Sequence, residues 1–231
     1  MRFSMKKVIL VILLLTLFSC GGGGGGGGES SSSNDSVVGT SGSGVRVLHG
    51  ALDAPPFDLF SNALSGELLQ RSRFGGPGGY SSVPVGEQVL SLAPARIGGA
   101  RITKTLTYHS GERYTFFVRS PQGDGNATVG VFLENPPPLS SGQAALRVYH
   151  GVSKVDLLKA KVGTLSPVSI SQGQASTYVI LPAGEISYLI RHGEEGHPLL
   201  SGSLNLAEGE IGALLVAGEP GIYLTARYYV G

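Results

Sequence analysis

Histidine and aspartate are the residue types in this sequence whose positions suggest chemistry, because a pair of them recurs. His49 precedes Asp58 in the first half of the chain, and His150 precedes Asp156 in the second half. An imidazole beside a carboxylate can transfer protons or bind a metal ion. The same side chains can instead hydrogen-bond the backbone of a turn. We favour the turn role, because two ligand types are too few for a closed metal site.

A few other residues could contribute to chemistry, but none has a distinctive context. Asp53 could add a carboxylate near His49, although the Asp-Ala-Pro-Pro segment that it begins is ordinary turn sequence. His192 and His197 flank two glutamates, but the glycines between them give a metal ion no rigid frame. The sequence contains no nucleophile elbow and no phosphate-binding loop. We therefore predict no catalytic residue, no metal site and no cofactor.

The only cysteine, Cys20, ends an N-terminal apolar segment. Three basic residues precede the apolar run at 8–18, and eight glycines follow the cysteine. The run has the length of a signal-peptide core, whereas a membrane-spanning helix needs about 20 apolar residues. The tetrapeptide Leu17-Phe18-Ser19-Cys20 resembles the bacterial lipoprotein signal. This resemblance implies cleavage after Ser19 and attachment of diacylglycerol to the Cys20 sulfur.

The segment after the cysteine has the composition of a flexible tether. Residues 21–44 are almost entirely Gly, Ser, Asn, Asp and Thr, and such a chain buries too little apolar surface to offset its conformational entropy. In the lipoprotein pattern, Gly21 in place of aspartate implies the outer membrane. Cleavage removes three of the 17 Lys and Arg residues and none of the 16 Asp and Glu residues. The mature chain is thus slightly acidic, which gives no reason to expect nucleic-acid binding.

The rest of the chain is an internal repeat. VRVLHG at 45–50 returns as LRVYHG at 146–151, and YSSVPVGE at 80–87 returns as YVILPAGE at 178–185. The aligned identities include Arg46 with Arg147, His49 with His150, Tyr80 with Tyr178, and Glu112 with Glu210. We predict two copies of one unit, joined by a proline-rich linker, because two copies are too few for a solenoid.

Each half has the pattern of β-strands. Leu146 and Val148 alternate with Arg147 and Tyr149, and the last segment, IYLTARYYV, alternates throughout. Turn sequences with Gly and Pro separate such runs at short spacing, which is typical of antiparallel sandwiches. The sequence predicts an all-β fold: two tandem antiparallel, Ig-like β-sandwich domains, folding independently, after a signal peptide and a flexible tether.

The predicted boundaries follow from these patterns. They are 1–19 for the signal peptide, 20–43 for the lipidated cysteine and tether, 44–135 for the first sandwich, 136–143 for the linker and 144–231 for the second sandwich.

Three segments of the first half resemble a known family. HGALDAPPFDLF at 49–60, YSSVPVGE at 80–87 and GERYTFFV at 111–118 are similar to the bacterial domain-of-unknown-function family numbered 4397. The second half keeps much of this pattern but lacks Asp-Ala-Pro-Pro. The resemblance implies tandem β-sandwich modules on exported or surface proteins, with no established activity.

These observations predict a membrane-anchored lipoprotein whose two sandwiches bind a partner or have a structural role in the cell envelope. The expected partners are the membrane, through lipid at Cys20, and an envelope protein or glycan. Tyrosines of the last strand could offer a surface to sugars or peptides. The alternative is an envelope hydrolase that uses His49 with Asp58 or His150 with Asp156.

Overall fold

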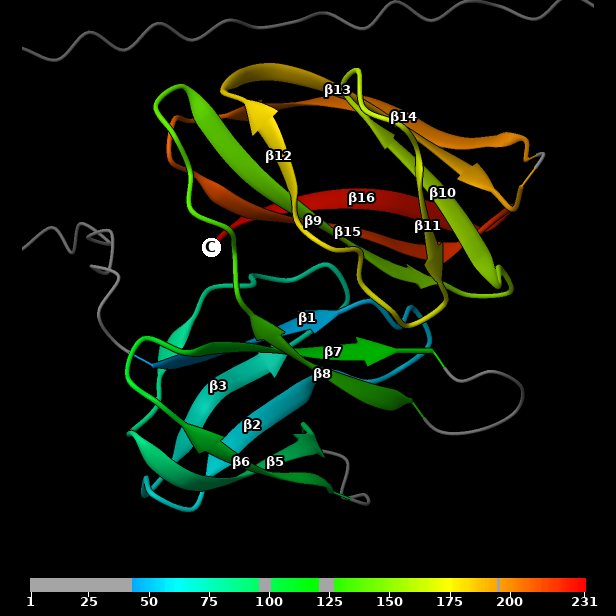
Figure 1. The fold of residues 1–231 in the computed structure, drawn as a ribbon. Coiled ribbons are helices and arrows are strands. Elements are labelled where there is room, and N and C mark those ends of the chain that lie inside the picture. Colours follow the sequence, from blue (N-terminus) through cyan, green and yellow to red (C-terminus); the bar gives the residue numbers. More distant parts are fainter. Residues whose placement is uncertain (1–42, 96–100, 121–126, 195) are drawn as a thin grey trace, which may run out of the picture. The chain divides into compact units, whose positions relative to one another are not determined.

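The first half of the chain folds into two four-stranded sheets (Figure 1). The computed structural model describes residues 43–95, 101–120, 127–194 and 196–231, so Cys20, the predicted signal peptide and all but the last residue of the predicted tether lie outside the described residues. One sheet has the order β4-β1-β7-β8 and the other β3-β2-β5-β6. The strand bounds are β1 Gly44–His49, β2 Phe57–Ser61, β3 Glu67–Ser72, β4 Ser81–Ser82, β5 Gly86–Pro94, β6 Ile102–Tyr108, β7 Arg113–Arg119 and β8 Thr128–Glu134.

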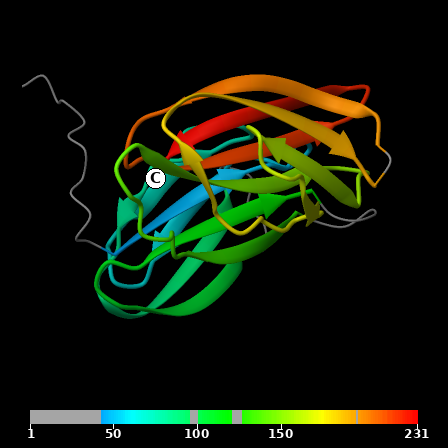
Figure 2. The same cartoon turned by 45° about the horizontal axis from the view of Figure 1, so that its top comes forward.

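The second half repeats this arrangement strand for strand. Figure 2 shows the same sheets turned by 45°. Its sheets have the orders β12-β9-β15-β16 and β11-β10-β13-β14. The bounds are β9 Gln143–Val152, β10 Leu157–Val162, β11 Val168–Ser171, β12 Val179–Pro182, β13 Gly184–His192, β14 Pro198–Leu206, β15 Ile211–Glu219 and β16 Tyr223–Val230. The predicted all-β fold with two sandwich-like regions is confirmed. Within the described ranges, no helix is long and apolar enough to cross a membrane.

The prediction of purely antiparallel sheets is wrong at one strand pair in each half. β1 runs parallel to β7, with Val45 opposite Tyr114. β9 runs parallel to β15, with Leu146 opposite Gly212. Parallel partners need a long connection, and in each half the chain forms all four strands of the other sheet before it returns. Turn motifs report only on pairing between neighbouring strands, so they could not indicate this one.

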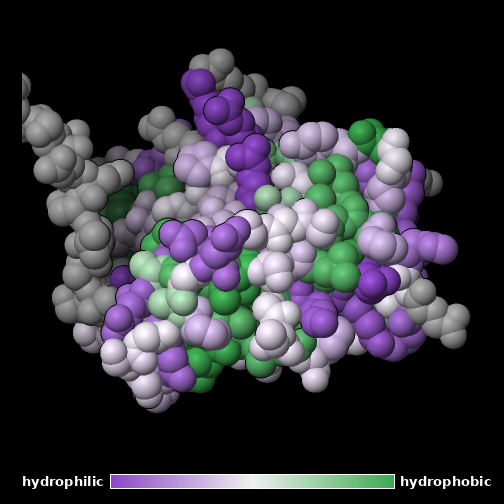
Figure 3. Space-filling model, turned by 90° about the horizontal axis from the view of Figure 1, so that it is seen from above, coloured by the Kyte–Doolittle hydropathy of each residue, from purple (hydrophilic) through white to green (hydrophobic). Residues whose placement is uncertain are grey.

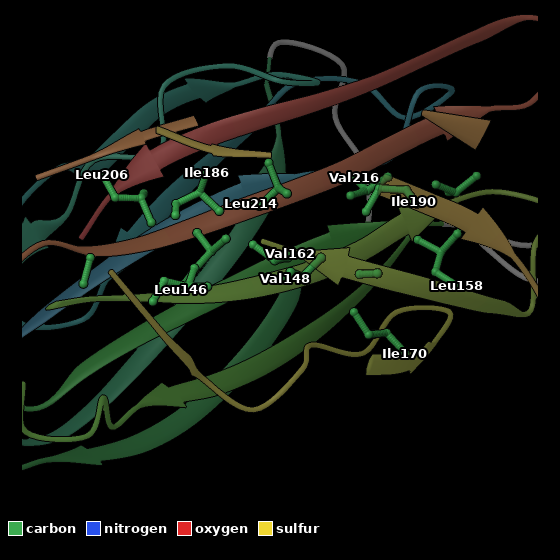
Figure 4. Close-up of a cluster of buried hydrophobic side chains, with 14 of the residues drawn as sticks. Leu146, Val148, Leu158, Val162, Ile170, Ile186, Ile190, Leu206, Leu214 and Val216 are labelled. Carbon is green, nitrogen blue, oxygen red and sulfur yellow. The ribbon is translucent and has the colours of Figure 1, made fainter. Parts of the chain in front are cut away.

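Each sandwich has its own hydrophobic core. In the second half, Leu146 and Val148 from β9 meet Leu158 from β10 and Ile190 from β13, and Figure 4 shows part of this cluster. In the first half, Val45 and Val47 from β1 occupy the corresponding core. The alternation predicted for β9 therefore places Leu146 and Val148 on the core face.

A third hydrophobic cluster joins the two halves. It contains Leu48 of β1, Phe117 of β7, Tyr149 of β9 and Leu215 of β15. The rings of Phe117 and Tyr149 meet edge to face, with centroids 5.4 Å apart. The central strands of both inner sheets are therefore buried on both faces, and the described residues of both sandwiches belong to one compact unit. The expectation of independent domains did not include this interface.

Two glycines that the repeat aligns permit this close packing. A Cβ atom on Gly50 would lie 2.9 Å from the Phe117 ring and 3.4 Å from the Cα atom of Gly151. A Cβ atom on Gly151 would lie 3.2 Å from the Cα atom of Gly50. Contacts closer than 3.4 Å are rare for real Cβ atoms. The sandwiches thus approach each other here through bare backbone.

The Gly-Glu turns before β7 and β15 also repeat in detail. Gly111 and Gly209 have φ values of +82° and +75°, a region that favours glycine. The carboxylate of Glu112 accepts a hydrogen bond from the backbone N–H of His109 at 2.9 Å. Glu210 makes the same bond to the residue that the repeat aligns with His109. Both glutamates are therefore engaged in their own turns.

Exposed hydrophobic residues are dispersed over the surface. Ile222, Val85 and Val230 are the most exposed of them, at 61–71%. The face shown in Figure 3 mixes hydrophobic with hydrophilic residues. Scattered apolar residues of this kind are normal for a soluble surface and do not by themselves mark a binding site.

Candidate functional site

The polar residues predicted in the first half bind separate parts of the backbone and of neighbouring loops. His49 is buried, and its Nε2 atom lies 3.0 Å from the carbonyl oxygen of Pro55. The Asp58 carboxylate accepts a hydrogen bond from the backbone N–H of Arg71 at 2.6 Å. Asp53 accepts one from the Ser120 hydroxyl at 2.7 Å. The structure gives His49 and Asp58 different partners.

His150 and Asp156, the corresponding residues of the second half, also have different hydrogen-bond partners. His150 is fully buried, and its Nδ1 accepts a hydrogen bond from the backbone N–H of Val152 at 3.2 Å. Asp156 is exposed, and its backbone oxygen accepts a bond from Gln172 at 2.9 Å. Among the described residues, no group of three or more His, Cys, Asp and Glu side chains could hold a metal ion.

The buried histidine makes stability depend on pH. Burial lowers the pKa of His150 from 6.5 to about 4. The backbone of Val155 acts to raise this pKa, and the charge of His192 lowers it further. The unfolded chain takes up this proton near pH 6.5, whereas the folded chain takes it up only near pH 4. Acidification across that window should therefore lower the free energy of unfolding, by about 3 kcal/mol at most. Urea unfolding at several pH values between 7 and 4 measures this loss.

A pair of variants isolates this contribution. His150→Gln should remove much of the pH dependence, while His197→Gln, at an exposed position, should leave it unchanged. Buried His49, whose pKa burial also lowers, accounts for a remaining slope of the same sign. An unaltered pH profile in His150→Gln would contradict the prediction.

A different residue, Glu134, accepts hydrogen bonds from several polar side chains of both sandwiches. Its side chain is 3% exposed at the end of β8. One carboxylate oxygen accepts hydrogen bonds from the Arg46 guanidinium at 3.2 Å and from the hydroxyls of Thr115 and Tyr149. The other accepts from the Arg147 guanidinium at 3.2 Å and from the Tyr178 hydroxyl. Five donors from both sandwiches thus meet on one carboxylate.

The ionised form of Glu134 is stabilised by these neighbours. Burial alone would raise its pKa, but the Arg46 charge and the three hydroxyl donors together lower it. Tyr149 and Tyr178 change in the opposite direction: burial and the adjacent carboxylate raise the pKa of each phenol. At neutral pH the cluster therefore holds a charged carboxylate between neutral tyrosines and charged arginines.

Repeat-related residues converge on this cluster. Arg46 and Arg147 reach the carboxylate from β1 and β9, and Tyr178 reaches it from the residue before β12. Tyr80, the partner of Tyr178 in the repeat, lies beneath the Arg46 guanidinium, 4.7 Å from ring centroid to Cζ. The aligned Arg and Tyr pairs were visible in the sequence, and they were the available signal for this site. Glu134 was missed, because the repeat has no glutamate at its equivalent position.

A small cavity opens beside the cluster. Its volume is about 180 Å³. It is lined by Arg46, Tyr80, Gly111, Arg113, Glu134, Pro136, Tyr178, Ile211 and Gly231. A more open hollow of about 490 Å³ lies next to it, along the proline-rich linker. Within the described residues, charged side chains, aromatic rings and cavity volume thus lie together at the junction of the sandwiches.

The tyrosines of β16, which could offer a surface to sugars or peptides, differ in how far they are buried. Tyr228 packs against the core of the second sandwich and donates a hydrogen bond to Glu210 at 2.5 Å. Tyr229 packs against the shared cluster. Tyr223 is 47% exposed, and its ring meets Phe74 of the first half. Packing covers much of Tyr228 and Tyr229, whereas Tyr223 remains partly exposed.

The fold and the junction define an all-β protein built from a fused pair of like sandwiches. The model of the family described as a domain of unknown function (DUF4397) matches residues 43–160, and the chain belongs to this family. The match covers the first sandwich and ends inside β10. No curated protein matches the sequence.

Two solved structures are similar to the chain at low scores. The N-terminal domain of AlgF from P. aeruginosa is 20% identical, with 40% of this chain and 99% of that domain covered and a TM-score of 0.29. A family CBM26 module from Eubacterium rectale Amy13K, solved with maltoheptaose, is 12% identical, with coverages of 80% and 96% and a TM-score of 0.27. At such scores neither likeness bears on the ligand of this chain.

Proposed function

We propose that the chain is an exported lipoprotein whose fused sandwiches act as a binding or structural module of the cell envelope, without enzymatic activity. The observation that carries this proposal is the engagement of Glu134 by five donors from both sandwiches. Through these bonds, the buried charges of Arg46 and Glu134 contribute to the contact between the two halves. Of the residues that a hydrolase would use, His49, Asp58 and His150 are hydrogen-bonded to separate backbone groups, and the Asp156 residue is exposed.

The anchor in this proposal is lipid on Cys20, supported by the lipoprotein-like Leu17-Phe18-Ser19-Cys20 segment. Each buried methylene contributes about 0.8 kcal/mol, and one acyl chain gives only marginal attachment. Two or three chains on one cysteine would anchor the protein stably. The Gly-rich segment would then hold the sandwiches away from the membrane, with the outer membrane favoured by Gly21.

Replacing Cys20 tests the anchor. In cells fed with labelled palmitate, Cys20→Ala should lose the label and move from the detergent phase to the aqueous phase, as an uncleaved or mis-sorted product. Ser19→Ala is the matched control, because alanine is equally small beside the cleavage site and should preserve both. Unchanged detergent partitioning of Cys20→Ala would overturn the anchor.

The binding role is tested with the mature chain, made soluble by Cys20→Ser and immobilised. We expect it to retain a defined protein or glycan from envelope fractions, and to leave chromogenic ester and glycoside substrates intact. Substrate cleavage that disappears in Asp58→Asn or Asp156→Asn would instead support the hydrolase alternative.

A further inference from the structure

We infer that the cavity at the junction of the sandwiches binds the carboxylate group of a small acidic ligand. This inference deepens the proposed binding role and rests on it. The cavity of about 180 Å³ is lined by Arg46, Arg113, Tyr80, Tyr178, Pro136 and Ile211, among others. Its walls therefore combine two guanidinium groups with aromatic and aliphatic surface.

One donor atom of the Arg46 guanidinium has no partner among the described residues. Arg46 is 1% exposed; its Nε donates to Thr115 at 2.8 Å and its Nη2 to Glu134 at 3.2 Å. Its Nη1 atom is buried and has no hydrogen-bond partner within the described part of the chain. Leaving a charged donor unpaired in the interior is costly. A ligand oxygen in the adjacent cavity would supply the missing acceptor.

Arginines outnumber acidic side chains around the cavity. Arg46 and Arg147 both form ion pairs with the single carboxylate of Glu134. Arg113 adds a third positive charge and, over the described ranges, makes no ion pair. Glu112, the acidic residue next to Arg113 in the sequence, accepts a hydrogen bond within its own turn. The charged side chains that line the cavity are Arg46, Arg113 and Glu134, and this small positive excess favours an anionic ligand.

The aromatic and aliphatic side chains that line the cavity bear on the kind of anion that it binds. Arg46 and Arg113 lie over the ring of Tyr80, with Cζ atoms 4.7 Å and 5.0 Å from its centroid. A guanidinium presents paired donors that match the oxygens of a phosphate as well as those of a carboxylate group. Pro136 and Ile211 offer apolar contact to the carbon atoms behind that group. An organic carboxylate fits these walls better than inorganic phosphate does.

Titration calorimetry of the mature chain carrying Cys20→Ser tests the site. Benzoate should bind saturably, while benzamide, its neutral counterpart, and inorganic phosphate should not. Arg113→Gln should weaken benzoate binding by about tenfold or more, because it removes a charged donor. Arg101→Gln is the matched control, since Arg101 also lies over an aromatic ring, that of Phe60, and should bind benzoate normally. Arg46 is left intact, because its loss would disturb the fold.

Further arms distinguish the sources of the carboxylate. Tighter binding of oligogalacturonate than of galacturonate would indicate an acidic glycan; equal or weaker binding of the oligomer would indicate a free acid. The inference is overturned if benzoate does not bind, if phosphate binds equally well, or if Arg113→Gln binds normally. Retention of an envelope component by a chain that binds no carboxylate would reject this site and preserve the broader binding role.

Discussion

Replacing Glu134 with alanine should lower the free energy of unfolding by about 3–5 kcal/mol, the range for breaking one side of a buried ion pair. The substitution leaves the Arg46 guanidinium, 1% exposed, without its carboxylate. It also removes the acceptor of three hydroxyl donors, those of Thr115, Tyr149 and Tyr178. Because these donors come from both sandwiches, the loss should fall on the interface as well as on the first half.

Urea unfolding of Glu134→Ala and Glu134→Gln measures this effect, and we expect the glutamine variant to be intermediate because it keeps two polar atoms in place. Glu194→Gln is the matched control. Glu194 also forms an ion pair, with Lys159, but the Glu194 side chain is 67% exposed. An exposed pair of this kind contributes roughly 0–1 kcal/mol. Equal effects of the Glu134 and Glu194 substitutions would show that the cluster has no special weight.

Separating the sandwiches should expose a shared hydrophobic face and weaken both halves. Fragments 44–137 and 143–231 each retain a core of their own, so each should still melt cooperatively. The first fragment would expose Leu48 and Phe117, which are now buried. Burying one large apolar side chain is worth about 1.5–3 kcal/mol. Each fragment should therefore be several kcal/mol less stable than the joined chain and should bind its counterpart when mixed.

Urea unfolding, dye binding to exposed apolar surface, and size-exclusion chromatography of the mixed fragments test this expectation. The joined chain should unfold in one transition, without added dye binding. Fragments that are as stable alone as together, and that elute separately from the mixture, would establish independent domains despite the shared cluster.

The sequence was informative wherever structure depends on neighbouring residues. Alternation along Leu146 to Tyr149 predicted a strand with Leu146 and Val148 on one face, which is the core face. Turn sequences with Gly and Pro predicted the breaks between strands. The continuous apolar run from Ala213 to Ala217 was an available sign of burial on both faces, since a strand with one wet face alternates. Alternation alone could not indicate what covers the second face of β9.

The sequence by itself therefore determined the all-β class and the two repeated units, because strand periodicity and turn chemistry act over a few residues. It also supplied the aligned Arg46 with Arg147 and Tyr80 with Tyr178. Only the tertiary structure decided that Arg46, Arg147 and Tyr178 meet on Glu134 with Tyr80 beneath Arg46, and that the two units share a hydrophobic cluster. Such contacts join residues far apart in the chain, and they form only when two folded faces pack against each other.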